Sequence, residues 1–98
     1  MTIAIDYDGT FTKDPLFFDD LVTLVDAYSH QAVLVTSRED RGAMGDDVRE
    51  AVGNIMPIVF AGSRPKREAA REAGFRVDVW IDDMPETIGA ALLVGNAR

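Results

Sequence analysis

Two aspartates, Asp6 and Asp8, stand one residue apart directly after the apolar run Ile3-Ala4-Ile5. Like charges at this spacing repel each other, so either one carboxylate takes up a proton or a cation lies between them. A second acidic pair, Asp82-Asp83, follows the apolar run from Val77 to Ile81. Taken alone, the first pair could equally form a structural turn, and the second could cap a helix. The placement of these residues in the fold separates the two interpretations.

Two further polar segments could join such a site. Thr36-Ser37-Arg38 follows the apolar run from Ala32 to Val35, and Lys66 lies near the start of an expected helix. Both also have an ordinary explanation, because the first could cap a helix and the second could belong to a solvated basic helix face.

Short apolar runs alternate with segments of helical periodicity along the chain. The expected strands run from Thr2 to Asp6, from Ala32 to Val35, from Ile58 to Ala61 and from Val77 to Ile81. The first expected helix covers residues 16–29. A loop is expected at residues 42–45, and the second helix follows it, with Asp46 or Asp47 as its cap. The last two cover residues 64–73, with Gly74 as the stop, and residues 85 to about 92.

This alternation predicts an α/β fold, a three-layer Rossmann-like parallel sheet of four or five short strands with helices on both faces. We expect one domain over residues 1–98, without a cap domain. Right-handed crossovers place the carboxyl ends of all strands at one edge, where ligands bind in such sheets. Four carboxylates and a hydroxyl would meet there, and a lysine could reach them: Asp6, Asp8, Asp82, Asp83, Thr36 and Lys66.

The composition narrows the classes of partner. The chain carries 17 Asp and Glu against 10 Lys and Arg, a net charge of −7, which disfavours binding to a nucleic-acid backbone. With no cysteine there is no disulfide and no thiolate nucleophile or metal ligand. No apolar run approaches the ~20 residues of a membrane span, and no basic region indicates a signal peptide, so we expect a cytoplasmic protein without membrane contact. A core this small leaves a homodimer open.

Four segments in chain order resemble the signature motifs of the haloacid dehalogenase-like (HAD) superfamily. They are Ile5-Asp6-Tyr7-Asp8-Gly9-Thr10, Val33-Leu34-Val35-Thr36, Lys66 and Trp80-Ile81-Asp82-Asp83. The first motif is fairly specific, and the correct order of the others adds to it. A two-component receiver domain gathers similar residues at a sheet edge, but its lysine comes last, whereas here the lysine precedes the final acid pair.

The resemblance implies a Mg²⁺-dependent phosphohydrolase. Asp6 would be the nucleophile that forms an aspartyl-phosphate, and Asp8 would be the general acid and base. The metal ligands would be the Asp6 side chain, the Asp8 main-chain carbonyl and one acid of the pair Asp82-Asp83. Thr36 would donate to a phosphoryl oxygen, and Lys66 would neutralise charge on the transferred group.

Neighbouring residues would complete the substrate site. Gly9 would allow close backbone approach, and Thr10 would hold the turn that aims Asp8. Ser37 offers a second hydroxyl beside the preferred one of residue 36. Arg38 lies in a segment that faintly resembles the hydroxyl-x-Arg segment of polynucleotide 3′-phosphatases, so it could bind a substrate phosphate in bidentate fashion, or equally be a surface arginine.

The sequence also departs from the family pattern. In many relatives a proline follows the motif lysine, and here Arg64 rather than Lys66 precedes the proline, so the two compete for that role. There is little room for the hairpin flap common in the family and no insertion long enough for a cap. Capless members tend to act on large or exposed phosphoesters, so the implied partner is a phosphorylated substrate of that kind. Two alternatives stay open, namely a non-catalytic regulatory or binding protein of the same fold and a nucleic-acid 3′-end phosphatase.

Overall fold

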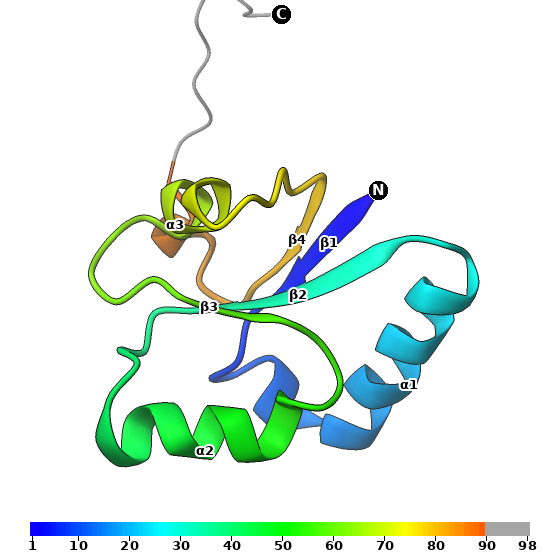
Figure 1. The fold of residues 1–98 in the computed structure, drawn as a ribbon, viewed down its shortest axis with the longest axis horizontal. Helices are drawn as coiled ribbons and strands as arrows, with labels where there is room; N and C mark the ends of the chain where they lie inside the picture. Colours follow the sequence, from blue (N-terminus) through cyan, green and yellow to red (C-terminus); the bar gives the residue numbers. More distant parts are fainter. Residues whose placement is uncertain (90–98) are drawn as a thin grey trace, which may run out of the picture.

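One parallel sheet organises the protein. The structure is a computed structural model that describes residues 1–89. Its four strands lie in the order β3-β2-β1-β4, and every neighbouring pair is parallel (Figure 1). The strands are β1 (Thr2–Ile5), β2 (Gln31–Thr36), β3 (Ile58–Phe60) and β4 (Val79–Ile81). The carboxyl ends of all four therefore point to the same edge, as the sequence predicts.

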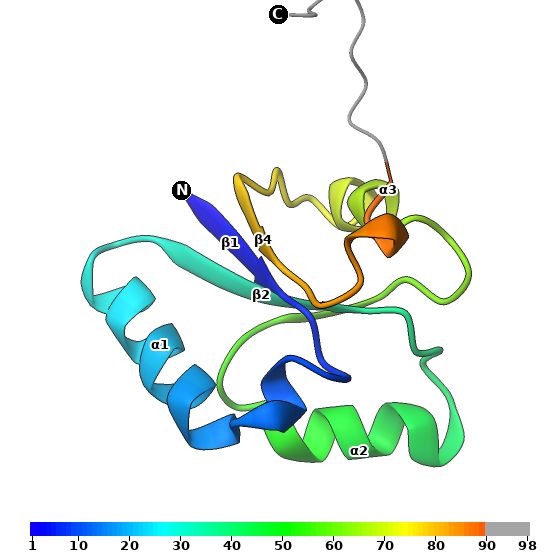
Figure 2. The same cartoon turned by 180° about the vertical axis from the view of Figure 1, so that it is seen from behind.

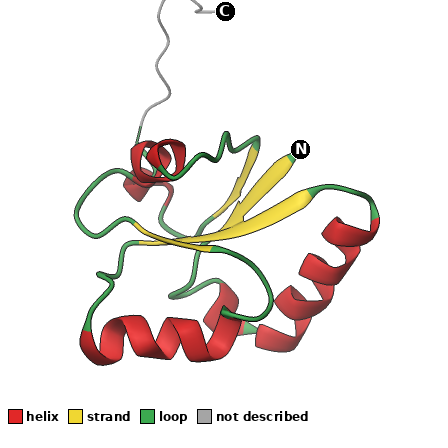
Figure 3. Ribbon diagram, viewed as in Figure 1, coloured by secondary structure: helices red, strands yellow, loops and turns green. Residues whose placement is uncertain are grey.

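Helices cover both faces of this sheet. The helices α1 (Pro15–Ala27) and α2 (Gly42–Val52) lie on one face, and α3 (Lys66–Glu72) lies on the other (Figures 1 and 2). Residues 1–89 also contain two short 3-10 helices (Figure 3). The first, η1 (Phe11–Lys13), connects β1 to α1, and the second, η2 (Pro85–Thr87), follows β4. The predicted three-layer α/β fold is confirmed. Within residues 1–89 no cap domain interrupts it, because only a turn and η1 separate β1 from α1.

The core consists of two apolar clusters, one on each side of the sheet. In β2, Leu34 belongs to the cluster under α1 and α2, whereas Val33 and Val35 belong to the cluster under α3. This alternation follows from the two-residue period of a strand. Burial on both faces explains why the strand is a continuous apolar run. On the α3 side, Ala69 and Ala70 are small enough to bring the helix close to the sheet.

The second helix begins earlier than the sequence indicates. Residues 42–45 were expected to form a loop, with a cap at Asp46 or Asp47, but α2 already begins at Gly42 and has no side-chain cap. The cause is packing, since Gly45, Val48 and Val52 are buried together on one face at spacings of three and four residues. Gly45 therefore lies on the packed face of the helix, and both aspartates lie inside the helix.

Other boundaries shift by one to three residues. The third helix begins at Lys66 rather than residue 64, because Pro65 keeps an extended ψ of 136°. Its end before Gly74, which has φ +96°, is as predicted. The fourth strand begins at Val79, where pairing with Ile3 of β1 starts. The expected last helix is only the single 3-10 turn η2 within the described residues, and its predicted continuation to residue 92 lies outside them. Among the helices of residues 1–89, none has the length and apolar character needed to cross a bilayer.

Candidate functional site

Three carboxylates meet at the carboxyl ends of two neighbouring strands. Ile5 of β1 pairs with Ile81 of β4, so the next residues, Asp6 and Asp82, leave the sheet side by side. The amide of Asp6 donates to the Ile81 carbonyl at 2.9 Å, which fixes this register one step further. Together with Asp83, these residues offer carboxylate oxygens that all lie within 4.8 Å of one another. Unscreened carboxylates this close repel strongly, so the cluster favours either a proton on one of them or a cation beside them.

Lys66 supplies one cation from the first residue of α3. Its Nζ lies 2.7 Å from Asp6 Oδ1 and 2.7 Å from Asp82 Oδ2, and the residue is 2% exposed. Arg64, the other candidate for this position, instead pairs with Glu72 on the surface. Of the two, the structure therefore brings the lysine to the carboxylates.

The electrostatics of the cluster follow from burial and from this lysine. Burial raises the pKa of Asp6 from its usual 3.8 to about 6, although the hydrogen bond from Lys66 acts in the opposite direction. For Lys66, burial alone would lower the pKa, but the hydrogen bonds to Asp6 and Asp82 outweigh it and raise the pKa above its usual value. At neutral pH the lysine is thus charged and Asp6 is largely ionised.

Gly9 makes room for the third carboxylate. It has φ +82°, and a Cβ at this position would lie 2.3 Å from Asp83 Oδ2, well inside contact distance. The Thr10 hydroxyl lies 3.1 Å from Asp6 Oδ2 and 3.4 Å from Asp83 Oδ1. The space above Gly9 is therefore taken by the Asp83 carboxylate, and the close approach of a substrate to this glycine stays a prediction. The Thr10 side chain contacts Asp6 and Asp83, and its role in holding the turn that aims Asp8 stays a prediction.

Asp8 does not join the three-carboxylate cluster. Its side chain is 56% exposed and receives a bidentate interaction from Arg38, whose Nε and Nη2 each lie 2.9 Å from a carboxylate oxygen. Arg38 also donates to the Met44 carbonyl at 3.1 Å, and its guanidinium lies 5.1 Å from the centre of the Tyr7 ring. The hydrogen bonds to Asp8 raise the pKa of Arg38. Asp8 thus lies at the same sheet edge, where β1 ends, but its side chain is turned to Arg38 rather than to the other three carboxylates.

The polar residues after β2 shape the neighbouring loop. Thr36 is buried at the end of the strand, and its hydroxyl accepts a hydrogen bond from the Arg38 amide at 3.1 Å. This bond turns the chain so that the arginine side chain extends toward Asp8. Ser37 between them is exposed. Because β2 pairs with β1, both hydroxyl residues lie at the same sheet edge as Asp6.

The donor set of the cluster fits a divalent cation. All candidate ligand atoms are carboxylate oxygens, which Mg²⁺ prefers over nitrogen or sulfur. Asp82 is already engaged, since one oxygen contacts Lys66 and the other accepts from the Met84 amide at 2.9 Å. Asp83 and the second oxygen of Asp6 lie beside each other and share the Thr10 hydroxyl as a partner. These two carboxylates are therefore better placed than Asp82 to take a metal ion.

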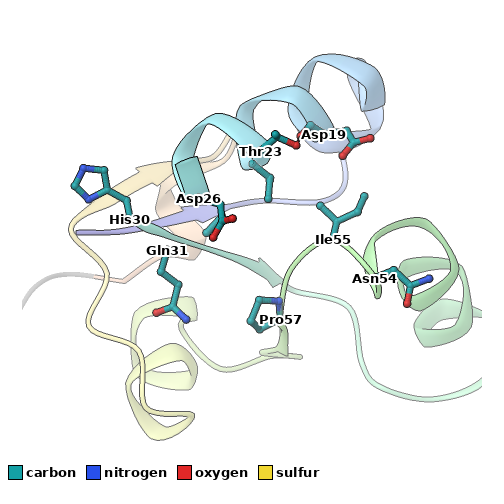
Figure 4. Close-up of a pocket in the computed structure, with 10 residues that line it drawn as sticks. Asp19, Thr23, Asp26, His30, Gln31, Asn54, Ile55 and Pro57 are labelled. Atoms are coloured by element: carbon teal, nitrogen blue, oxygen red, sulfur yellow. Dashed lines mark hydrogen bonds between the residues drawn. The ribbon is translucent and has the colours of Figure 1, made fainter. Parts of the chain in front are cut away.

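A pocket of about 540 Å³ lies elsewhere, at the opposite edge of the sheet. It is lined by residues of α1, the start of β2 and the connection from α2 to β3, including Asp19, Asp26, His30 and Asn54 (Figure 4). Both carboxylates come from α1, and none of the residues that follow the strands at their carboxyl ends lines this pocket. The candidate site is therefore placed at Asp6 because of the side chains that meet there, although the larger pocket lies elsewhere.

Comparisons with protein families, with curated proteins and with solved structures found no match to this chain.

Proposed function

We propose that this protein is a Mg²⁺-dependent phosphohydrolase of the HAD type, which cleaves a phosphate monoester through an aspartyl-phosphate on Asp6. The observation that supports the proposal is the group formed by the buried residues Asp6 and Lys66 and the Asp82-Asp83 pair at adjacent strand ends. A purely structural ion pair would need one acid for one lysine. Here one lysine faces two acids, and Asp83 adds a third carboxylate, so a further cation would offset their mutual repulsion.

In this proposal Asp6, Asp83 and the main-chain carbonyl of Asp8 would hold Mg²⁺, with Asp82 as a supporting acid that positions Lys66. When bound, the ion would supply positive charge that screens Asp6 from the phosphate and orients the phosphoryl oxygens. Lys66 would add a second positive charge beside the nucleophile, and Thr36 would donate a hydrogen bond to the transferred group.

The chain's own residues would carry the covalent steps. An oxygen of Asp6 attacks phosphorus, the ester P–O bond breaks, and the leaving alkoxide takes a proton from Asp8. Asp8 then removes a proton from water, the water oxygen attacks phosphorus, and the P–O bond to Asp6 breaks to release phosphate. Asp83 is exposed, and no cap covers the site within residues 1–89, so a large phosphoester has access.

The contact between Asp8 and Arg38 favours a second candidate, a non-catalytic binding protein of the same fold. A general acid must turn toward the leaving group, whereas both oxygens of Asp8 are held by the guanidinium. In the catalytic proposal, an anionic part of the substrate takes over Arg38 and releases Asp8. The Arg38→Gln variant separates the two candidates. If the protein is catalytic, the variant should lose activity toward phosphoesters, whereas a binding protein has no such activity in the wild type or in the variant.

A phosphatase panel with and without Mg²⁺ tests the proposal. It should include nitrophenyl phosphate, mononucleotides, sugar phosphates and 3′-phosphorylated oligonucleotides. We expect Mg²⁺-dependent release of phosphate from at least one of them, and its loss in Asp6→Asn. Asp26→Asn, an exposed position at the other edge of the sheet, is the matched control and should retain activity. Release of phosphate from none of them, by a folded protein that still binds Mg²⁺, would favour the non-catalytic candidate.

A further inference from the structure

Basic residues are concentrated in one short part of this acidic protein. Residues 64–76 hold five of the ten Lys and Arg and two acids, a net charge of +3 in a chain of net charge −7. Two of the five are already paired, because Arg64 contacts Glu72 and Lys66 belongs to the carboxylate cluster. The other three together line one pocket of about 170 Å³, and they are Arg67, Arg71 and Arg76.

The local fold brings these three side chains together. Arg67 and Arg71 are four residues apart on α3, so they lie on the same helix face. After the helix the chain reverses, and the amide of Phe75 donates to the Ala70 carbonyl at 2.9 Å. This turn brings Arg76 back to the face that the two helical arginines share, and Phe75 and Val77 form the apolar part of the wall.

The charges of the pocket have no partner within the part of the chain that the structure describes. Neither Glu68 nor Glu72 lines it, and no ion pair joins its arginines to an acid in residues 1–89. Arg67 is nevertheless held in place, because its Nε lies 3.3 Å from the Gly89 carbonyl and its guanidinium lies 5.7 Å from the centre of the Trp80 ring. A fixed guanidinium loses less entropy when it binds an anion.

We propose that this arginine pocket binds a phosphoryl dianion, either inorganic phosphate or the terminal phosphate of a monoester. Guanidinium groups bind phosphate oxygens in bidentate fashion, and three of them exceed what a singly charged anion needs. The pocket, at about 170 Å³, is smaller than the ~300–1,000 Å³ of sites that enclose a whole small molecule, so it fits one compact group. This site is separate from Asp6 and does not depend on the proposed catalysis.

Nuclear magnetic resonance of the arginine Nε–Hε groups tests the proposal in the full chain without Mg²⁺. The titrants are inorganic phosphate, methyl phosphate and dimethyl phosphate, with sodium chloride at matched ionic strength. We expect saturable shifts of Arg71 and Arg76 with a dianion, and the stronger of phosphate and methyl phosphate identifies the source. The signal of Arg38 reports binding near Asp6 separately.

Variants separate a specific site from general charge. Arg71→Gln and Arg76→Gln should each weaken phosphate binding by about tenfold, as the loss of one charge-assisted hydrogen bond predicts. Arg41→Gln removes the same charge from an arginine whose side chain is 79% exposed, and it should leave the affinity unchanged. Equal weakening in all three variants would overturn the proposal. So would equal shifts with sodium chloride, or dimethyl phosphate binding as tightly as phosphate.

Discussion

The short helix α3 contributes to two sites, the carboxylate cluster and the arginine pocket, whose charges are stabilised in opposite ways. At its start, Lys66 is buried and lies 2.7 Å from each of two carboxylates. In its last turn, Arg71 is exposed and lines a pocket that contains no acid. The difference shows how burial decides whether a charge needs a partner. A desolvated lysine is stable only when it is paired with anions of the fold, whereas a hydrated guanidinium is stable without an ion pair and remains free to bind a ligand. The first site is therefore tied to stability and the second is not.

The largest effect should come from removing the buried lysine. In Lys66→Met, Asp6 and Asp82 keep their places without their cation, so the free energy of unfolding should fall by about 3–5 kcal/mol near neutral pH. Arg64→Met breaks only an exposed pair with Glu72 and should cost about 0–1 kcal/mol. Urea denaturation of both variants measures the difference. Equal losses of unfolding free energy in the two variants would mean that burial does not determine how much these ion pairs contribute to stability.

A second test concerns the space that Gly9 leaves for Asp83. Gly9→Ala should destabilise the protein by about 1–3 kcal/mol, because φ +82° is unfavourable for alanine and the new methyl group displaces the carboxylate. It should also weaken Mg²⁺ binding in calorimetric titration. Gly42→Ala is the matched control, since φ is +57° there and no atom lies within 4 Å of the added carbon. If both variants bind Mg²⁺ like the wild type, Asp83 is not a ligand.

The carboxylate cluster should also respond to pH, whereas the arginines should not. Protonated Asp6 is a poor metal ligand, and burial raises its pKa to about 6 in the metal-free protein. Mg²⁺ affinity should therefore be constant above about pH 7 and fall by roughly tenfold per unit well below pH 6. Titration calorimetry at pH 7.5, 6 and 5 checks this. The same affinity at all three values would exclude the Asp6 carboxylate as a ligand.

The smallest effect on stability should come from a substitution in the exposed arginine pocket. Arg71→Gln leaves no buried charge unpaired, so the free energy of unfolding should change by less than about 0.5 kcal/mol. Phosphate should raise the melting temperature of the wild type by mass action, and raise that of the variant less. Thermal denaturation with phosphate or chloride at equal ionic strength measures both. A large loss of stability in Arg71→Gln without phosphate would show that this arginine has a structural partner.

The part of the site that depends on topology could be predicted from the sequence. Once the strands are parallel, residues that follow them must share an edge, which accounts for Asp6, Thr36 and the pair Asp82-Asp83. Lys66 followed because it begins the helix that returns from the same edge. These predictions need only strand ends and chain direction, and errors of one or two residues in an element do not change them.

The parts that depend on side-chain conformation could not be predicted in this way. Arg38 reaches Asp8 across 30 positions of sequence, and the contact depends on a loop and on a side chain with many rotamers. The start of α2 was placed too late because aspartate is a common cap, whereas burial of Gly45 decided the boundary. The arginine pocket required the turn after Gly74, which the sequence marks as a helix end without giving its direction.

The identity of the phosphorylated residue tests the central claim most directly. Asp8→Asn should still transfer phosphate from an activated ester with a good leaving group, but it should hydrolyse the intermediate slowly because water lacks its general base. Wild type, Asp8→Asn and Asp6→Asn should be mixed with the ester and Mg²⁺, quenched in acid and analysed by peptide mass spectrometry. The account predicts a phosphoryl group on Asp6 that accumulates in Asp8→Asn and is absent from Asp6→Asn. A phosphoryl group on any other residue, or turnover that persists in Asp6→Asn, would contradict it.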